Sequence, residues 1–141
     1  MIILEDLKRI AEIEFSDIVE NTDRIGSKLR VLLIDDSFID VWLSQKLEDR
    51  FGFHWEEKGT GLSYRYDNFP NTKWVNVSTY PFHFHDGSQD SVIDTSRFER
   101  DIKAGFRGFI GRFSVYPAYA VSILLRVHGT VFLVQQVGLA G

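Results

Sequence analysis

A chain of 141 residues with 44% hydrophobic residues is long enough to bury one core, so we expect one domain-sized folding unit. The absence of cysteine excludes a disulfide framework, a thiolate zinc site and a cysteine nucleophile. The net charge of −4 opposes whole-molecule attraction to nucleic acid, so a nucleic-acid partner would need a local basic surface.

The first element that the sequence predicts is an amphipathic helix from Leu4 to about Glu20. Apolar residues recur there every three or four positions, with charged residues between them. The segment has neither the basic flank nor the long apolar run of a secretion signal, so we expect a cytoplasmic protein. Residues 21–28, which include Gly26, are interpreted as a connector.

Four antiparallel strands are expected next. Alternating apolar residues predict strands around residues 29–33, 39–43, 51–55 and 62–66. Short turn sequences such as Gly59-Thr60-Gly61 separate them. Consecutive strands joined in this way are typical of an antiparallel meander.

The region after residue 70 is less regular. The sheet is expected to continue through Val75 and Val77, then from Tyr80 to His85, and Ser91–Ile93 would add a short strand. Pro81 cannot donate to a strand ladder, which favours an edge position or a bulge.

A second amphipathic helix is predicted to begin near Arg97. Ser96 and Glu99 have the spacing of a capping box, and phenylalanine and isoleucine residues follow at helical spacing. The predicted fold class is therefore α+β, with an antiparallel sheet of five or six strands, an N-terminal helix and a helix after the sheet.

Residues 114–141 differ in character from the domain that we predict over residues 1–113. They contain no acidic residue, and the runs 121–127 and 131–137 are apolar and rich in β-branched residues, which predicts an apolar C-terminal hairpin.

The apolar extension has two consequences for partners. Arg126 and His128 interrupt the roughly 20 apolar residues that a membrane span needs, so no membrane partner is expected. Nearly uncharged strands invite edge pairing, which favours a homodimer in the absence of another partner, with residues 119–137 in the contact.

Two segments alternate aromatic and ionisable residues, and they carry the candidate catalytic groups. On a β-strand, period-two alternation sends Arg65 and Asp67 to one face, and His83 and His85 likewise share a face. A cation, a carboxylate and two imidazoles that titrate near neutral pH are suited to acid–base chemistry on a phosphate.

The same segments resemble the TumE-type toxins of prokaryotic toxin–antitoxin pairs. The resemblance follows Phe51-Gly-Phe-His-Trp-Glu, Tyr64-Arg-Tyr-Asp-Asn-Phe-Pro, Val77-Ser-Thr-Tyr-Pro-Phe-His-Phe-His-Asp-Gly and Val92-Ile-Asp, and covers roughly residues 4 to 113. The chain departs from the family pattern at Asn71, where a histidine commonly follows the proline, and in its apolar extension. The resemblance implies a small cytoplasmic toxin that is encoded beside an antitoxin with a helix-turn-helix domain.

Three hypotheses for the activity follow from the residues and the resemblance. The first is a metal-independent endoribonuclease without cofactor, in which Arg65 stabilises the scissile phosphate, Asp67 belongs to the same catalytic cluster, and His83 or His85 acts as base and acid. The second is a non-catalytic module that binds a partner protein or oligomerises. The third is a metal-dependent hydrolase that uses His83 and His85 with Asp67 or Asp86, although we expect no stoichiometric metal.

Structural roles compete with these functional ones. The structural alternative for Arg65 and Asp67 is a solvent-side ion pair worth less than about 1 kcal/mol, and Asp67-Asn68 is also typical of a turn cap. For RNA binding we consider Arg107, Arg112 and Tyr66, although the rings of Tyr64, Tyr66, Phe82 and Phe84 are expected in the core rather than as base-stacking platforms.

Overall fold

The structure, a computed structural model, describes residues 1–114. The predicted C-terminal extension, residues 114–141, lies outside the described residues except for Ser114. The hairpin and the dimer contact predicted within it therefore lie outside them as well. The elements in chain order are α1 (Leu4–Glu14), β1 (Val19–Ile25), β2 (Lys28–Leu33), β3 (Phe38–Leu43), β4 (Phe51–Glu56), β5 (Ser63–Asp67), the 3-10 helix η1 (Thr72–Trp74), β6 (His83–Gly87), β7 (Val92–Ile93) and α2 (Ile102–Ser114).

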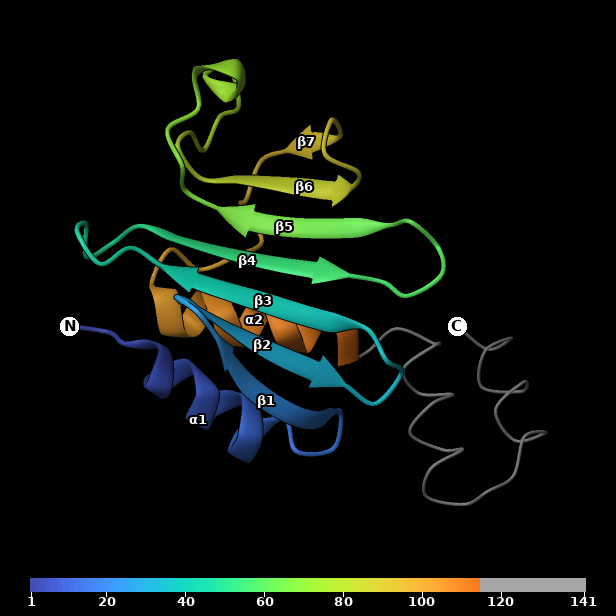
Figure 1. Ribbon diagram of the computed structural model, residues 1–141. Coiled ribbons are helices and arrows are strands. Elements are labelled where there is room, and N and C mark those ends of the chain that lie inside the picture. The colour runs from blue at the N-terminus through green and yellow to red at the C-terminus, as the bar shows by residue number, and fades with distance from the viewer. Residues whose placement is uncertain (115–141) are drawn as a thin grey trace.

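The strands form one antiparallel sheet in which every strand pairs with its neighbours in sequence, in the order β1-β2-β3-β4-β5-β6-β7. Both helices pack on the same face of this sheet, and the other face is open (Figure 1). The α+β class, the N-terminal helix and the helix after the sheet are thus confirmed. Within residues 1–114, no helix is long and apolar enough to cross a bilayer.

The core lies between the helices and the covered face of the sheet. Alternate residues of β2 to β6 point into it, and Phe53, Tyr66, Phe84 and Phe106 are fully buried there. Burial of a large aromatic side chain contributes on the order of 1.5–3 kcal/mol, so this layer holds the sheet in register. The prediction that the strand aromatics belong to the core is confirmed for Tyr64, Tyr66 and Phe84.

The sequence-based expectation for residues 15–28 is wrong. α1 ends at Glu14 rather than Glu20, and β1 occupies the end of the predicted helix and most of the supposed connector. It pairs with β2 across a turn where Gly26 has a φ of +62°. As an edge strand, β1 leaves most of its side chains exposed and so lacks the apolar alternation of a half-buried strand. The sheet therefore has seven strands instead of five or six.

The region between β5 and β6 also differs from expectation. Val75 and Val77 do not lie in a strand, because residues 72–74 form η1 and turns follow it up to β6. Val75 is accordingly exposed. The short strand expected near Ser91–Ile93 is present as β7.

The second helix begins at Ile102 and not near Arg97. The Ala104 amide donates to Asp101 Oδ2 at 3.0 Å, so Asp101 caps the helix, whereas the Ser96 hydroxyl donates to Asp94. The predicted capping box is therefore wrong. Gly105 of this helix is needed for close packing, because a Cβ there would lie 2.7 Å from the Glu99 carbonyl oxygen.

Candidate functional site

The four candidate catalytic residues come together on the open face of the sheet. β5 and β6 are antiparallel neighbours, and their register pairs Arg65 with His85 and Asp67 with His83. The alternating residues Tyr66 and Phe84 point to the covered face and anchor both strands in the core. The predicted sharing of one face by all four groups is confirmed in its geometry.

Asp67 is at the centre of this cluster, and its side chain is only 3% exposed. Its Oδ1 accepts a hydrogen bond from the Phe69 amide at 2.9 Å, so the carboxylate also caps the turn that follows β5, as the structural interpretation expected. Arg65 Nε lies 2.8 Å from Asp67 Oδ2, yet this buried nitrogen makes no hydrogen bond with any residue that the structure describes. The attraction between Arg65 and Asp67 is thus mainly that of two opposite charges.

Both imidazoles are oriented by backbone carbonyls. His83 Nδ1 lies 2.9 Å from Pro81 O, and His85 Nδ1 lies 2.8 Å from Gln89 O. Because a carbonyl oxygen only accepts, each Nδ1 carries the proton, and in the neutral ring the lone pair is then on Nε2. Burial lowers the pKa of His85 below its usual value, an effect that the Gln89 carbonyl partly opposes.

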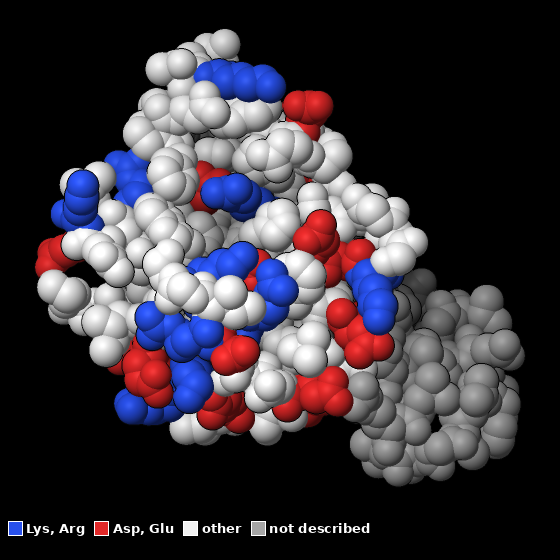
Figure 2. Space-filling model, viewed as in Figure 1, with Lys and Arg blue, Asp and Glu red and all other residues white. Residues whose placement is uncertain are grey.

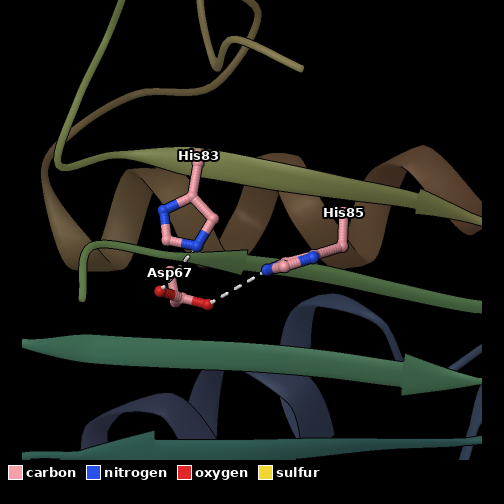
Figure 3. Close-up of side chains that lie close together, drawn as sticks. All are labelled: Asp67, His83 and His85. Carbon is pink, nitrogen blue, oxygen red and sulfur yellow. Dashed lines mark ion pairs between the residues drawn. The ribbon is translucent and has the colours of Figure 1, made fainter. Parts of the chain in front are cut away.

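The two Nε2 atoms converge on the same carboxylate (Figure 3). His83 Nε2 is 3.3 Å from Asp67 Oδ1, and His85 Nε2 is 3.9 Å from Asp67 Oδ2. In the described part of the chain, Asp67, His83 and His85 form a group whose potential metal-ligating atoms lie within 4.8 Å of one another. The cluster thus offers two nitrogen donors and one oxygen donor to a cation.

Asp86, the other carboxylate considered as a ligand, is not part of this group. It pairs in register with Tyr64, on the strand positions that alternate with His83 and His85, and its Oδ1 lies 3.9 Å from Arg112 Nη2. The metal alternative that used Asp86 is therefore wrong, because Asp86 belongs to the opposite face of the sheet.

A cavity of about 470 Å³ opens over the cluster. Its lining is formed by Arg65, Asp67, Phe69, Pro70, Asn71, Trp74, His83, His85 and Gln89. Trp74 meets the His85 ring edge to face at a centroid distance of 5.7 Å, and Phe69 stacks on Trp42 at 5.1 Å. Figure 2 shows basic and acidic side chains interspersed over this side of the molecule, so the approach to the cavity has no single sign of charge.

The residues considered for nucleic-acid binding lie apart from this cavity. Arg107 is paired with Glu14 by two contacts of 2.8 and 2.9 Å, and the Arg112 guanidinium lies 5.0 Å from the centre of the Phe84 ring, both on the helix side of the sheet. Tyr66 is fully buried and donates to the Glu99 carbonyl, and burial raises the pKa of Tyr66 to about 12. The expectation that Tyr66 contacts RNA is therefore wrong, because its ring lies inside the core.

Some groups of the site were missed by sequence reasoning. The carbonyls of Pro81 and Gln89 orient the imidazoles, and Trp74 forms one wall of the cavity. Backbone carbonyls carry no side-chain signal, and Trp74 lies in a segment expected to continue the sheet. Asn68 has a structural role, but not as the turn cap considered for it: its side chain accepts from the Phe51 amide and donates to the Asp49 carbonyl, both far from it in sequence.

Comparison with known proteins identifies one family. The family model described as Toxin TumE matches residues 2–112, which is most of the chain and contains the whole cluster on β5 and β6. No curated protein and no solved structure matches the chain.

Proposed function

The chain belongs to the TumE toxin family, which implies an antitoxin partner, and on this premise we propose that its toxic activity is the cleavage of RNA. The proposed site is the cavity over Arg65, Asp67, His83 and His85. We further propose that the antitoxin carries a helix-turn-helix domain, that the RNA is met in the cytoplasm, and that the toxin without its antitoxin is a homodimer.

One observation carries the proposal of RNA cleavage. An arginine whose buried Nε makes no hydrogen bond within the described residues stands beside two carbonyl-oriented imidazoles at the base of an open cavity. A planar guanidinium matches the oxygens of a phosphate, and imidazoles are the side chains that transfer protons most readily near neutral pH. The cluster therefore combines charge stabilisation with proton transfer, which are the two requirements of phosphodiester cleavage.

The aromatic side chains near the cavity support a single-stranded substrate. Trp74 lines the cavity itself, and the stacked pair of Trp42 and Phe69 lies at its edge through Phe69. Proteins that recognise single-stranded RNA commonly stack unpaired bases on aromatic side chains of a sheet face. We therefore propose single-stranded RNA as the substrate.

The metal-independent mode that the sequence predicts has a defined proton balance. One imidazole takes the proton of the 2′-hydroxyl while the 2′-oxygen forms a bond to phosphorus. The bond from phosphorus to the 5′-oxygen breaks, and the second imidazole, protonated, gives its proton to that oxygen. The products are a 2′,3′-cyclic phosphate and a 5′-hydroxyl, and Arg65 stabilises the charge on the phosphate oxygens.

The test is RNA cleavage by the purified full-length protein. We expect cleavage of a single-stranded oligoribonucleotide, and an Arg65→Gln variant should lose about 100-fold in rate, as is typical when one charge-stabilising donor is removed. Arg30→Gln is the matched control. Arg30 lies on the same face of the sheet as Arg65, and a row of paired residues that runs through Asp40 and His54 joins the two arginines. The control variant should cleave at the wild-type rate per folded molecule.

Growth arrest separates this proposal from the non-catalytic alternative. Induced expression of the wild-type chain should arrest growth, and Arg65→Gln expressed to the same level should not. If purified protein leaves RNA intact while Arg65→Gln still arrests growth, the toxin acts by binding and the proposal is wrong.

A further inference from the structure

We infer that Asp67, His83 and His85 form a binding site for one divalent transition-metal ion, whose remaining coordination positions face the cavity. The inference concerns the same site as the proposed function and would define how that site works, but the metal site itself stands whatever the substrate is. It departs from the sequence-based expectation of no metal.

The first argument is the direction of the lone pairs. Each Nδ1 is committed to a backbone carbonyl, His83 to Pro81 O and His85 to Gln89 O, so in the neutral rings both Nε2 atoms present lone pairs. These lone pairs meet the carboxylate of Asp67, which in its ionised form also only accepts. Three acceptors that face one another are stable when a cation lies between them.

The second argument is the spacing of the three groups. Ligands bound to zinc at about 2.0–2.1 Å and at tetrahedral angles lie about 3.3 Å from one another. The distance from His83 Nε2 to Asp67 Oδ1 is 3.3 Å, and that from His85 Nε2 to Asp67 Oδ2 is 3.9 Å. These two distances end on different oxygens of Asp67, and all three potential ligand atoms lie within 4.8 Å of one another. Side-chain movements of up to about 1.5 Å would bring the three ligands to tetrahedral spacing around one ion.

The third argument is the support behind the ligands. Metal-binding histidines usually donate their other ring N–H to a carbonyl or carboxylate, which is the arrangement found for both imidazoles here. The carboxylate is held by the Phe69 amide on Oδ1 and by the charge of Arg65 beside Oδ2. All three ligands are nearly fully buried, so their orientations are set before an ion binds.

The donor set determines the class of metal. Two imidazoles and one carboxylate suit zinc, manganese, iron or cobalt, whereas magnesium and calcium prefer sites made of oxygen ligands. Three protein ligands leave at least one position open, as in catalytic zinc sites, and here that position faces the cavity. A bound ion would act on a phosphate oxygen as a Lewis acid, so cleavage would be metal-dependent and would replace the metal-independent mode.

The test is metal binding by the full-length, tag-free protein after treatment with EDTA. We expect calorimetry with Zn²⁺ to give one saturable site per chain, and Co²⁺ to produce the visible absorption of an ion with nitrogen and oxygen ligands. The variants His83→Gln, His85→Gln and Asp67→Asn should each weaken Zn²⁺ binding at least about 100-fold, the upper range for loss of groups that support a metal site.

The matched control is His54→Gln. His54 lies on the same open face, one strand from Arg65, but its Nε2 faces Glu56 at 4.0 Å, outside the cluster. This variant should bind Zn²⁺ as the wild-type chain does. Circular dichroism identifies any variant that fails to fold, and in that case the Co²⁺ spectrum of the wild-type protein still decides the question.

The outcomes separate this inference from the proposed function. Saturable binding that is lost in His83→Gln and retained in His54→Gln supports the metal site, even if RNA stays intact. No saturable binding of Zn²⁺ or Co²⁺, or binding that His83→Gln leaves unchanged, overturns it. Cleavage of RNA at full rate in EDTA overturns the metal-dependent mode of cleavage while supporting the proposed function, and formation of a 2′,3′-cyclic end would then identify the metal-independent mode.

Discussion

Two of the carboxylates on the open face of the sheet lie in contrasting surroundings. Asp40, on β3, accepts hydrogen bonds from Arg30 Nε at 2.8 Å, Arg30 Nη2 at 2.9 Å and Lys28 Nζ at 2.9 Å. Asp67, on β5, faces an arginine Nε that makes no hydrogen bond within residues 1–114 and two imidazole nitrogens at 3.3 and 3.9 Å. The same sheet face thus holds one closed ion-pair network and one open cluster.

The contrast separates a carboxylate held by cationic donors from one that has room for a ligand. Burial by itself raises the pKa of Asp40, but the hydrogen bonds from Arg30 and Lys28 outweigh it and hold that pKa below its usual value. Asp40 accepts three hydrogen bonds from two cationic side chains, so little of its hydrogen-bonding capacity is left for a further ligand. Asp67 keeps oxygen lone pairs that its neighbours in the described chain do not fill, and a cavity gives a ligand access to them.

The largest effect is expected from Asp67→Asn. RNA cleavage should fall by about 100-fold or more, because the substitution removes the charge at the centre of the cluster. The asparagine side chain would still offer an oxygen to the Phe69 amide, and the Arg65 side chain is 35% exposed and reaches water. The free energy of unfolding should therefore change by about 1 kcal/mol or less. Cleavage assays and urea denaturation of the same preparation measure both effects, and a severely destabilised variant with normal specific activity would assign Asp67 to structure alone.

Asp40→Asn should reverse this pattern. We expect a loss of about 1–2 kcal/mol in the free energy of unfolding, because hydrogen bonds to charged groups are lost but Arg30 and Lys28 are each about one-third exposed and partly screened by water. Cleavage of RNA should be unchanged. Urea denaturation with the midpoint and slope reported separately checks the first expectation, and reduced specific activity would contradict the division between the two clusters.

The acid sensitivity of stability should come in part from Asp40. Its pKa is lower in the folded chain than its ordinary value of 3.8, so its contribution is fully present above that pH and is lost as the pH falls through the lowered folded value. The difference in unfolding free energy between the wild-type chain and Asp40→Asn should accordingly shrink below about pH 4. Denaturation series at pH 7, about 4 and about 3 measure it. A difference that stays constant to the lowest pH would show that Asp40 is not held in its ionised form by the network.

The smallest effect is expected at the Arg107–Glu14 pair, which resembles the Arg30–Asp40 pair in geometry but not in surroundings. Arg107 contacts both oxygens of Glu14 at 2.8 and 2.9 Å, yet both side chains are more than 40% exposed. Solvent screens such a pair, so Arg107→Ala should leave the thermal unfolding midpoint within experimental error. A clear drop in the midpoint would show that solvent exposure is a poor guide to which ion pairs stabilise this fold.

Much of the fold was accessible from local sequence patterns, because the strands that build the core alternate apolar and polar residues. β2 to β5 have one buried face and were predicted close to their observed bounds. β1 was missed because its side chains are mostly exposed, and the start of α2 was misplaced because Ser96 and Glu99 mimic a capping box while the cap is provided by Asp101. Edge strands and helix starts depend on tertiary neighbours that a local pattern does not contain.

The sequence by itself determined which side chains share a face of a strand, since alternation is a property of the extended backbone. It therefore assigned Arg65 to the face of Asp67, and His83 to that of His85. Only the tertiary structure decided that these two pairs meet, because the register of β5 against β6 closes a gap of 15 residues through η1 and its turns. It also decided that the carbonyls of Pro81 and Gln89 turn both Nε2 atoms toward Asp67, since backbone groups are positioned by the path of the whole chain and not by their own side chains.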